Sequence, residues 1–302
     1  DIKNGVLNGN VIIKAGNDVT LGSKYFDDTN PEKVLKFLKK SFNKNGIFSI
    51  NGKIIVDLSI LPPPYQPAGR IIEDIGNYYA ATPQGLNWKD NSVNIILNSS
   101  KIEGELAEVV THNPKLSEYR INSYLLSANN SKDSAYVYGN FASQSIDIRG
   151  SIPKGRNAFI IRAANPQPHI SFVNDFTTLF ANSNFTVEYL YEPFLAENIR
   201  KVCEITSPSS FEIIKIINQQ SNNLFADNVY LSLPIVANSW ERWHKSALFI
   251  KEFWESKELI SSSIIYDGSG LSPNNKLSTK YIVDVLKHMY YSENYEFFKN
   301  TL

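Results

Sequence analysis

The sequence is nearly free of cysteine and has no surplus of charge of either sign. Cys203 is the only cysteine among 302 residues, which excludes an internal disulfide and any metal site made of several thiolates. It lies in the apolar stretch 201–205, so we expect a buried, unreactive thiol rather than a nucleophile. Because 30 Lys and Arg balance 30 Asp and Glu, the chain has no electrostatic footprint for nucleic acid or an anionic membrane.

Long apolar runs and the common short catalytic motifs are also missing. No run approaches the roughly 20 residues that a transmembrane helix needs. There is no signal peptide, so we expect that any targeting segment has been removed or lies outside these residues. Gly-x-Ser-x-Gly, a Walker A loop and Gly-x-Gly-x-x-Gly are absent, which leaves nucleotide and dinucleotide chemistry without support.

The few histidines are not spaced as metal ligands. None has a partner at i+4 or in a His-x-His pair, so there is no local zinc signature, and we expect neither a metal nor another cofactor. A Ser-His-Asp triad built from distant segments stays open, because spacing along the chain does not test it. The histidines are His112, His169, His244 and His288.

What is present predicts a multi-domain α/β protein. The chain is 42% hydrophobic and 12% aromatic, and its 302 residues exceed what one core usually fills. The first part alternates helices and strands, the middle is rich in β-prone runs, and the last hundred residues have helical periodicity. We expect strands at 11–14, 53–58, 91–97, 120–126, 135–140, 143–148, 159–163 and 264–265, and helices at 31–40, 71–81, 170–180, 222–233 and 240–254, with a capping box at Ser209 and Glu212 and a last helix after Ser278.

A polar cluster interrupts the helical region at Ser221 and Asn223. It reads Asn-Gln-Gln-Ser-Asn-Asn from 218 to 223 and lies between two apolar helical runs. Serine and asparagine are also the best helix N-caps, so capping is the alternative interpretation of these two residues. A second pattern follows at 267–272, Asp-Gly-Ser-Gly-Leu-Ser, which by itself is only a turn.

In this order the two patterns resemble the D-alanyl-D-alanine carboxypeptidase/endopeptidase family, the low-molecular-mass class C penicillin-binding proteins. Asn218–Ala226 resembles the segment that holds the Ser-x-Asn motif of that family, and 267–272 resembles its Asp-Gly-Ser-Gly loop. The stretches 9–18, 54–57 and 150–155 also look like family landmarks. The resemblance therefore covers most of the chain.

The resemblance implies catalytic roles for residues in both patterns. Ser221 and Asn223 would be catalytic, relaying a proton and holding the substrate amide. Asn223 and the loop residues Asp267, Gly268, Ser269 and Gly270 would contact the substrate. The family attacks the bond between terminal D-alanines of peptidoglycan stem peptides through an acyl-enzyme, and β-lactam antibiotics acylate the same serine. The site would face the periplasm or the cell exterior.

Two of the three motifs of the family are not where they are expected. The chain has no Lys-Thr-Gly, and the Ser-x-x-Lys at Ser41–Lys44 lies at the end of a predicted helix, where we interpret it as a solvated helix terminus. A second literal match, Ser151–Lys154, falls in the stretch 150–155 that resembles a family landmark. We therefore expect the nucleophile outside these residues, in a longer parent enzyme. A non-catalytic peptidoglycan-binding or cell-wall assembly protein on the same fold is the alternative, and an unrelated multidomain hydrolase is a third, weaker one.

The resemblance also implies a domain plan. A partial penicillin-binding, β-lactamase-like transpeptidase domain would comprise 1–23 and 194–302. A first inserted domain would comprise 24–86 and 189–193, and a second, β-rich one would be nested in it at 87–188.

Overall fold

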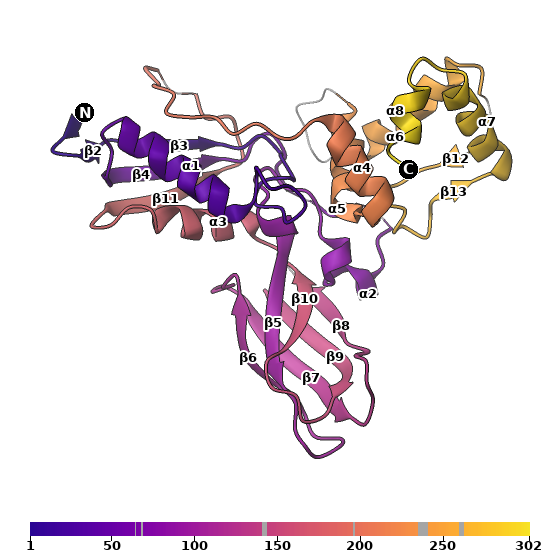
Figure 1. Cartoon of the computed structure of the whole chain (residues 1–302), viewed down its shortest axis with the longest axis horizontal. Helices are drawn as coiled ribbons and strands as arrows, with labels where there is room; N and C mark the ends of the chain where they lie inside the picture. The colour runs from indigo at the N-terminus through magenta and orange to yellow at the C-terminus, as the bar shows by residue number, and fades with distance from the viewer. Residues whose placement is uncertain (64, 68, 141–143, 196, 235–240, 260–262) are drawn as a thin grey trace.

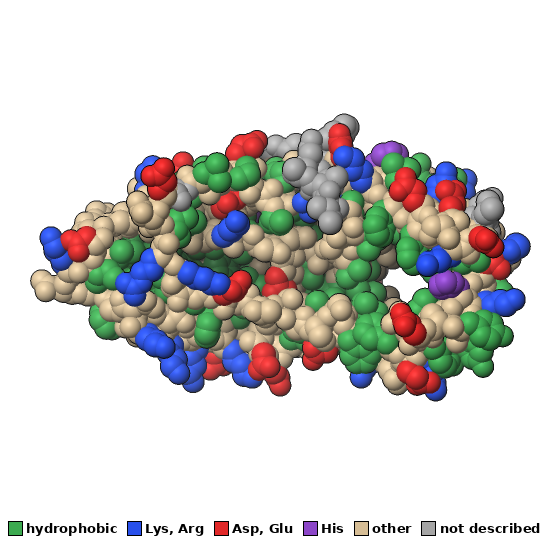
Figure 2. All heavy atoms as spheres, turned by 90° about the horizontal axis from the view of Figure 1, so that it is seen from above, with side chains coloured by type: hydrophobic (Ala, Val, Ile, Leu, Met, Phe, Trp, Pro, Cys, Tyr) green, Lys and Arg blue, Asp and Glu red, His purple; other side chains and the backbone are tan. Residues whose placement is uncertain are grey.

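The chain folds into three parts that are easily told apart in Figure 1. The computed structural model describes residues 1–302 except 64, 68, 141–143, 196, 235–240 and 260–262. The three parts are a five-stranded sheet with two helices, a β-rich lobe inserted between β4 and α3 of that first part, and a C-terminal group of helices. The predicted multi-domain α/β class is confirmed. Lys and Arg alternate with Asp and Glu over the face shown in Figure 2, in keeping with the zero net charge.

The five-stranded sheet is built around one buried strand. β4 (Ser49–Asp57) pairs in parallel with β2 (Val6–Asn8) and β3 (Val11–Lys14) on one side and with β11 (Asn184–Leu190) on the other, and β1 (Ile2–Lys3) pairs antiparallel with β2. The sequence predicted β3 and β4 but not β11. The exposed pattern of β11 gives little periodicity, and its place is decided by the long-range register that pairs Asn184 with Asn51 and Leu190 with Asp57.

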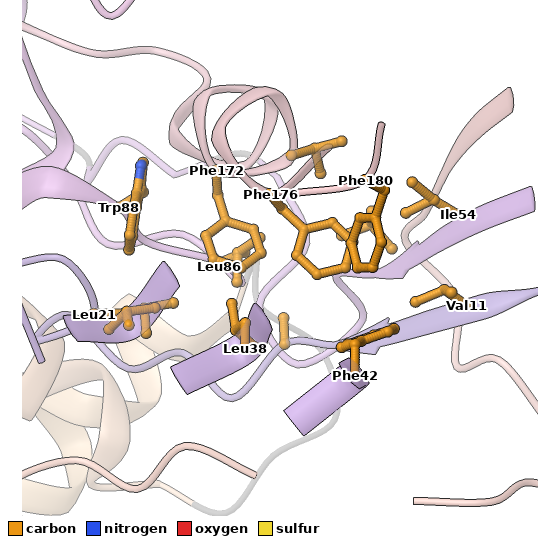
Figure 3. Close-up of a cluster of buried hydrophobic side chains, with 14 of the residues drawn as sticks. Val11, Leu21, Leu38, Phe42, Ile54, Leu86, Trp88, Phe172, Phe176 and Phe180 are labelled. Carbon is orange, nitrogen blue, oxygen red and sulfur yellow. The ribbon is translucent and has the colours of Figure 1, made fainter. Parts of the chain in front are cut away.

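Helices α1 (Pro31–Lys44) and α3 (Pro168–Thr177) pack on the same face of this sheet. Asn30 caps α1 by accepting the Lys33 amide at 2.9 Å, and Val34, Leu38 and Phe42 form its buried stripe. Both helices were predicted, and the structure extends α1 to Lys44. Figure 3 shows the aromatic rings of α3 facing α1, and the ring centroids of Phe42 and Phe176 are 5.6 Å apart.

The β-rich lobe consists of two three-stranded sheets around their own core. One sheet has the order β10-β5-β6 and the other β7-β9-β8. Their inward side chains form a hydrophobic cluster in which Ile95, Leu125 and Ile148 are fully buried. The strands are β5 (Ser92–Asn98), β6 (Glu108–Asn113), β7 (Arg120–Ala128), β8 (Tyr136–Asn140), β9 (Ser145–Pro153) and β10 (Phe159–Ala164). All but β6 were predicted, and Ser143, where one predicted strand began, lies outside the described residues.

The predicted helix at 71–81 is wrong. The chain forms a four-residue helix α2 (Ile72–Ile75) and, after Gly76 and Asn77, a 3-10 turn η1 (Tyr78–Ala80); a second turn, η2 (Lys89–Asn91), precedes β5. The helix is interrupted at Asn77, whose side chain binds the backbone of β8 as a neighbouring strand would. It accepts the Val137 amide at 3.1 Å, and the Ala164 amide donates to the Gly76 carbonyl at 2.9 Å. This segment thus joins β8 of one sheet to β10 of the other.

The C-terminal part is helical. It contains α4 (Ser210–Gln220), α5 (Asn223–Ser232), α6 (Arg242–Glu255), α7 (Thr279–Tyr290) and α8 (Tyr295–Lys299), with the short strands β12 (Ser263–Ile264) and β13 (Lys276–Leu277). The predicted capping box at Ser209 and Glu212 and the cap at Ser278 are confirmed. Trp240, the predicted start of α6, lies outside the described residues. None of the helices in the described part combines the length and hydrophobicity that crossing a bilayer requires.

The predicted domain limits stay a prediction. The sheet itself takes strands from 2–14, 49–57 and 184–190, and α3 shares its core.

The close approach at Gly76 gives a first test. A Cβ atom at Gly76 would lie 2.2 Å from the Val137 carbonyl oxygen, so we expect Gly76→Ala to lower the free energy of unfolding by about 1–3 kcal/mol. Gly16→Ala is the control, because a Cβ there meets nothing within 4 Å, and its effect should stay within about 0.5 kcal/mol. Urea unfolding measures both. Equal effects would contradict the role given to Gly76.

His169 gives a second test, on pH dependence. It is buried on α3 with Nδ1 3.3 Å from Gln84 Oε1, and burial lowers the pKa of His169 to about 4. The unfolded chain takes up this proton near pH 6.5 but the folded chain does not. Stability should therefore fall as the pH drops from 6.5 to 4, by up to roughly 3 kcal/mol at about 1.4 kcal/mol per pKa unit.

The controls for this pH dependence are two glutamine variants. His169→Gln removes the titrating group and should flatten the profile between pH 6.5 and 4. His244→Gln changes an exposed residue and should keep the profile of the unaltered chain. Chemical denaturation at several pH values measures both profiles. A flat profile in the unaltered chain would show that His169 does not titrate as stated.

Candidate active site

The candidate site lies where α4 ends and α5 begins. Ser221 follows the last turn of α4, and Asn223 is the first residue of α5, so both predicted residues meet at one helix junction. The alternative interpretation of these two residues as N-caps is wrong. Asn222 is the cap, because its side chain accepts the Phe225 amide at 3.0 Å. The side chains of Ser221 and Asn223 thus take no part in the N-cap of α5.

Ser221 has a backbone conformation that disfavours serine. Its φ of 51° and ψ of 48° lie in the left-handed region, where helix ends usually carry glycine or asparagine. A residue with a Cβ atom pays roughly 1 kcal/mol there. Its side chain is exposed at the junction. In this conformation Ser221 is the C-cap of α4, its backbone amide donates to the Ile217 carbonyl, and its hydroxyl group takes no part in the cap.

Asn223 connects this junction to a segment far away in the sequence. Its Nδ2 donates to the carbonyl oxygen of Tyr79, in η1, at 2.9 Å. The contact sets the orientation of the amide, with Nδ2 toward η1 and Oδ1 turned away from it. Asn223 therefore presents a hydrogen-bond acceptor from a fixed position.

Helix α5 is itself fixed at several points. Phe225 is fully buried and stacks on Phe26 with ring centroids 5.9 Å apart. One turn later Asn228 donates to the Asn17 carbonyl at 2.9 Å. The turn at 15–26 thus anchors the helix that starts with Asn223.

The loop at 267–272 docks on the same helix. The amides of Gly268 and Ser269 both donate to Asp227 Oδ1, at 3.0 and 2.9 Å. Glycine is required at 268, because a Cβ atom would lie 2.4 Å from the Ala226 carbonyl oxygen. The two patterns that the sequence analysis joined by resemblance are therefore attached to one helix, α5.

Asp267 organises this loop from within. Its side chain is buried and accepts the Gly270 and Ser272 amides, each at 2.9 Å, and the Asn275 side chain at 2.7 Å. Gly268 and Gly270 are exposed and Ser269 is half-buried. The substrate contact predicted for Asp267–Gly270 stays a prediction, and the exposed members are the ones that could make it.

Arg70 joins α5, the loop at 267–272 and η1, and no pattern in the sequence predicted it. Its Nη2 donates to Asp227 at 2.9 Å, to Asp267 at 3.2 Å and to the Ser269 hydroxyl at 3.2 Å. Its Nη1 donates to the Ala80 carbonyl at 3.3 Å. Its side chain is 1% exposed, and both carboxylates are fully buried. The available signal was Asp227, the one charged residue of α5, which requires a partner when it is buried.

Two opposing effects act on Asp227. Burial raises the pKa of this carboxyl, while the charge of Arg70 and its hydrogen bond oppose the rise. Removing one partner of such a group leaves the other buried and uncompensated, which is strongly destabilising. The geometry of the loop at 267–272 therefore depends on the buried cluster of Arg70, Asp227 and Asp267.

The other candidate groups lie elsewhere or are absent. Ser41 and Lys44 belong to the last turn of α1, which confirms their interpretation as a helix terminus. Cys203 is half-buried against the sheet core, and burial raises the pKa of its thiol, so it remains protonated and unreactive. Among the described residues, no group of three His, Cys, Asp or Glu side chains could hold a metal ion.

Asp227→Asn tests the cluster. An amide nitrogen in place of either oxygen would face a donor, because the guanidinium binds one oxygen and the Gly268 and Ser269 amides bind the other. We therefore expect a loss of about 3–5 kcal/mol in unfolding free energy, and faster hydrogen exchange at the Gly268 and Ser269 amides as the loop loosens. Glu188→Gln is the control, because its ion pair with Lys53 is exposed and worth less than about 1 kcal/mol. Unchanged exchange at both amides in Asp227→Asn would contradict the assignment.

Comparisons with known proteins place this geometry in a family. The model of the D-Ala-D-Ala carboxypeptidase 3 (S13) family matches residues 1–302. The D-alanyl-D-alanine carboxypeptidase DacB of Haemophilus influenzae is 23% identical over 309 residues, which cover 97% of this chain and 60% of that protein. The chain thus spans less than two thirds of the length of this relative.

Solved structures agree with this result at the level of the fold. The crystal structure of penicillin binding protein 4 (dacB) from Haemophilus influenzae matches with a TM-score of 0.75 and 19% identity, over 98% of this chain and 64% of that one. The same protein complexed with a novel β-lactam matches with a TM-score of 0.65 and 18% identity, over 98% of this chain and 62% of that one. The chain belongs to the D-Ala-D-Ala carboxypeptidase 3 (S13) family, as the resemblance in its sequence predicted.

Proposed function

We propose that this chain supplies the Ser-x-Asn part of a serine-type D-Ala-D-Ala carboxypeptidase that acts on peptidoglycan stem peptides through an acyl-enzyme. The observation that carries the proposal is that Ser221 and Asn223 meet at the junction before α5, the helix onto which Asp227 fastens the loop 267–272. The same chemistry at a peptide cross-link would be an endopeptidase activity. Membership of the S13 family and the related DacB protein support the proposal.

Each residue of the site has a distinct role in this proposal. Ser221 relays a proton through its exposed hydroxyl group. Asn223 holds a substrate N–H through Oδ1, since its Nδ2 is engaged by Tyr79. The exposed backbone at Gly268 and Gly270 borders the substrate, and Asp267 keeps the loop in shape.

The attacking serine is not Ser221 in this proposal. Acylation needs a hydroxyl group activated by a neighbouring base such as lysine, and the residue at i+3 from Ser221 is Leu224. The sequence contains no Lys-Thr-Gly either. We infer that the nucleophile is supplied by another part of the natural gene product, which acts in the periplasm or outside the cell. β-Lactams are the expected inhibitors, as the complex of the related structure suggests.

The second candidate function is a non-catalytic peptidoglycan-binding or cell-wall assembly protein. The observation that favours it is the absence of a correctly placed Ser-x-x-Lys and of Lys-Thr-Gly from these 302 residues. A fluorescent penicillin separates the two candidates. The natural gene product should be labelled covalently if it is an enzyme, and the 302-residue chain should not be labelled.

Two substitutions in the natural gene product test the roles of the site. Ser221→Gly should relieve the left-handed strain and stabilise the fold by roughly 0.5–1 kcal/mol while it slows acylation by penicillin, because the proton relay is lost. Asn223→Ala should weaken substrate binding by about 1–3 kcal/mol. Stopped-flow acylation rates and release of D-alanine from a stem pentapeptide measure these effects.

Ser256→Ala is the matched control, since Ser256 is another exposed serine at the end of a helix, α6. It should leave both rates unchanged. Mass spectrometry after penicillin treatment locates the adduct. An adduct on Ser221, Ser41 or Ser269 would show that the nucleophile is misassigned, and an unlabelled gene product that still binds peptidoglycan would favour the non-catalytic candidate.

A further inference from the structure

The outer face of the β7-β9-β8 sheet carries aromatic and planar polar side chains in register. Tyr124 on β7 and Tyr136 on β8 are both register partners of Arg149 on β9. Each of the two tyrosines is 51% exposed. The inward-facing residues of the same strands form the lobe core, so the outward ones are free to contact a ligand. In the next row across the sheet, Asn122, Asp147 and Tyr138 are likewise partners.

These side chains hold one another in place. The Arg149 guanidinium carbon lies 5.6 Å from the Tyr124 ring centroid and 5.7 Å from that of Tyr138. Arg149 also reaches Asp147 at 3.7 Å, and Asn122 Nδ2 donates to Asp147 Oδ1 at 2.9 Å. The pairs leave further donors and acceptors unused, because a guanidinium has five N–H groups and a carboxylate has several lone pairs. The face is therefore organised before any ligand arrives, which lowers the entropic cost of binding.

A hollow continues the same face. It has a volume of about 430 Å³ and is lined by Glu118, Arg120, Gln144 and Ser145. Arg120 and Ser145 are register partners, two residues along their strands from Asn122 and Asp147. The hollow is therefore the next row of the platform rather than a separate feature.

The chemistry of the face selects a class of ligand. Arg149 pairs with Asp147, and Arg120 and Glu118 line the same hollow, so these four residues carry no net charge and offer no attraction to a polyanion. Tyrosine rings give flat apolar area with a polar edge. Neighbouring strands lie about 4.8 Å apart, which is close to the length of one pyranose ring, so rings and polar groups can alternate at the spacing of a sugar chain.

We propose that the outer face of the β7-β9-β8 sheet binds a neutral oligosaccharide of pyranose rings. Tyr124 and Tyr136 would stack on the apolar faces of the sugars, and Asn122, Asp147 and Arg149 would bind their hydroxyl groups. The face lies on the lobe that projects away from α4 and α5 in Figure 1, so this binding does not rest on the proposed peptidase activity.

Titration of the 302-residue chain with chitohexaose tests the proposal. Isothermal calorimetry or NMR should show saturable binding with a dissociation constant of about 10 µM to 1 mM. Tyr124→Ala and Tyr136→Ala should each weaken binding about fivefold to tenfold, and the double variant should weaken it further. Ser221→Ala should bind as the unaltered chain does, which separates this site from the peptidase site.

Tyr291→Ala is the matched control, because Tyr291 is an exposed tyrosine at the end of α7. It should bind chitohexaose as the unaltered chain does. Circular dichroism and thermal unfolding establish that each variant is folded. Absence of saturable binding, an equal loss in Tyr291→Ala, or tighter binding of a heparin hexasaccharide than of chitohexaose would each overturn the proposal.

Discussion

The buried guanidinium of Arg70 is the interaction on which the candidate site depends. It brings Asp227 of α5 and Asp267 of the following loop to one point, and a second nitrogen holds the carbonyl of Ala80. Two carboxylates so close together, away from water, would repel one another without a cation between them. Because the loop amides in turn bind Asp227, the position of the loop follows from that of Arg70.

The same region shows why the site draws on segments so distant in the sequence. Asn223 binds the carbonyl of Tyr79, and Tyr79 follows the segment in which Gly76 and Asn77 join the two sheets of the β-rich lobe. The lobe, η1 and the helix junction are therefore linked by short hydrogen bonds. Arg70 lies just before α2 and binds the Ala80 carbonyl at the end of η1, so it spans the same segment.

The two faces of the β7-β9-β8 sheet differ in what packing requires of them. The inward residues of β7, β8 and β9 form a dry core, in which Leu125, Val137 and Ile148 are fully buried. Because side chains alternate along a strand, every second residue lies on the opposite face and does not pack in the core. Residues on the outer face, such as Tyr124 and Arg149, can therefore contact one another without disturbing the packing of the core.

The sequence by itself determined most of the regular elements and the place of the two motifs. Local signals sufficed for the cap at Asn30, the capping box at Ser209 and the stripe of α1, because each depends on residues a few positions apart. The Ser221–Asn223 pair and the loop at 267 were likewise legible as short patterns. The cap of α5 was ambiguous among Ser221, Asn222 and Asn223, which are adjacent polar residues, and the structure selects Asn222. Only the tertiary structure decided that β11 joins β4. It also decided that Arg70 lies between two aspartates 157 and 197 residues away, since no local pattern specifies a contact whose partners meet only when the chain has folded.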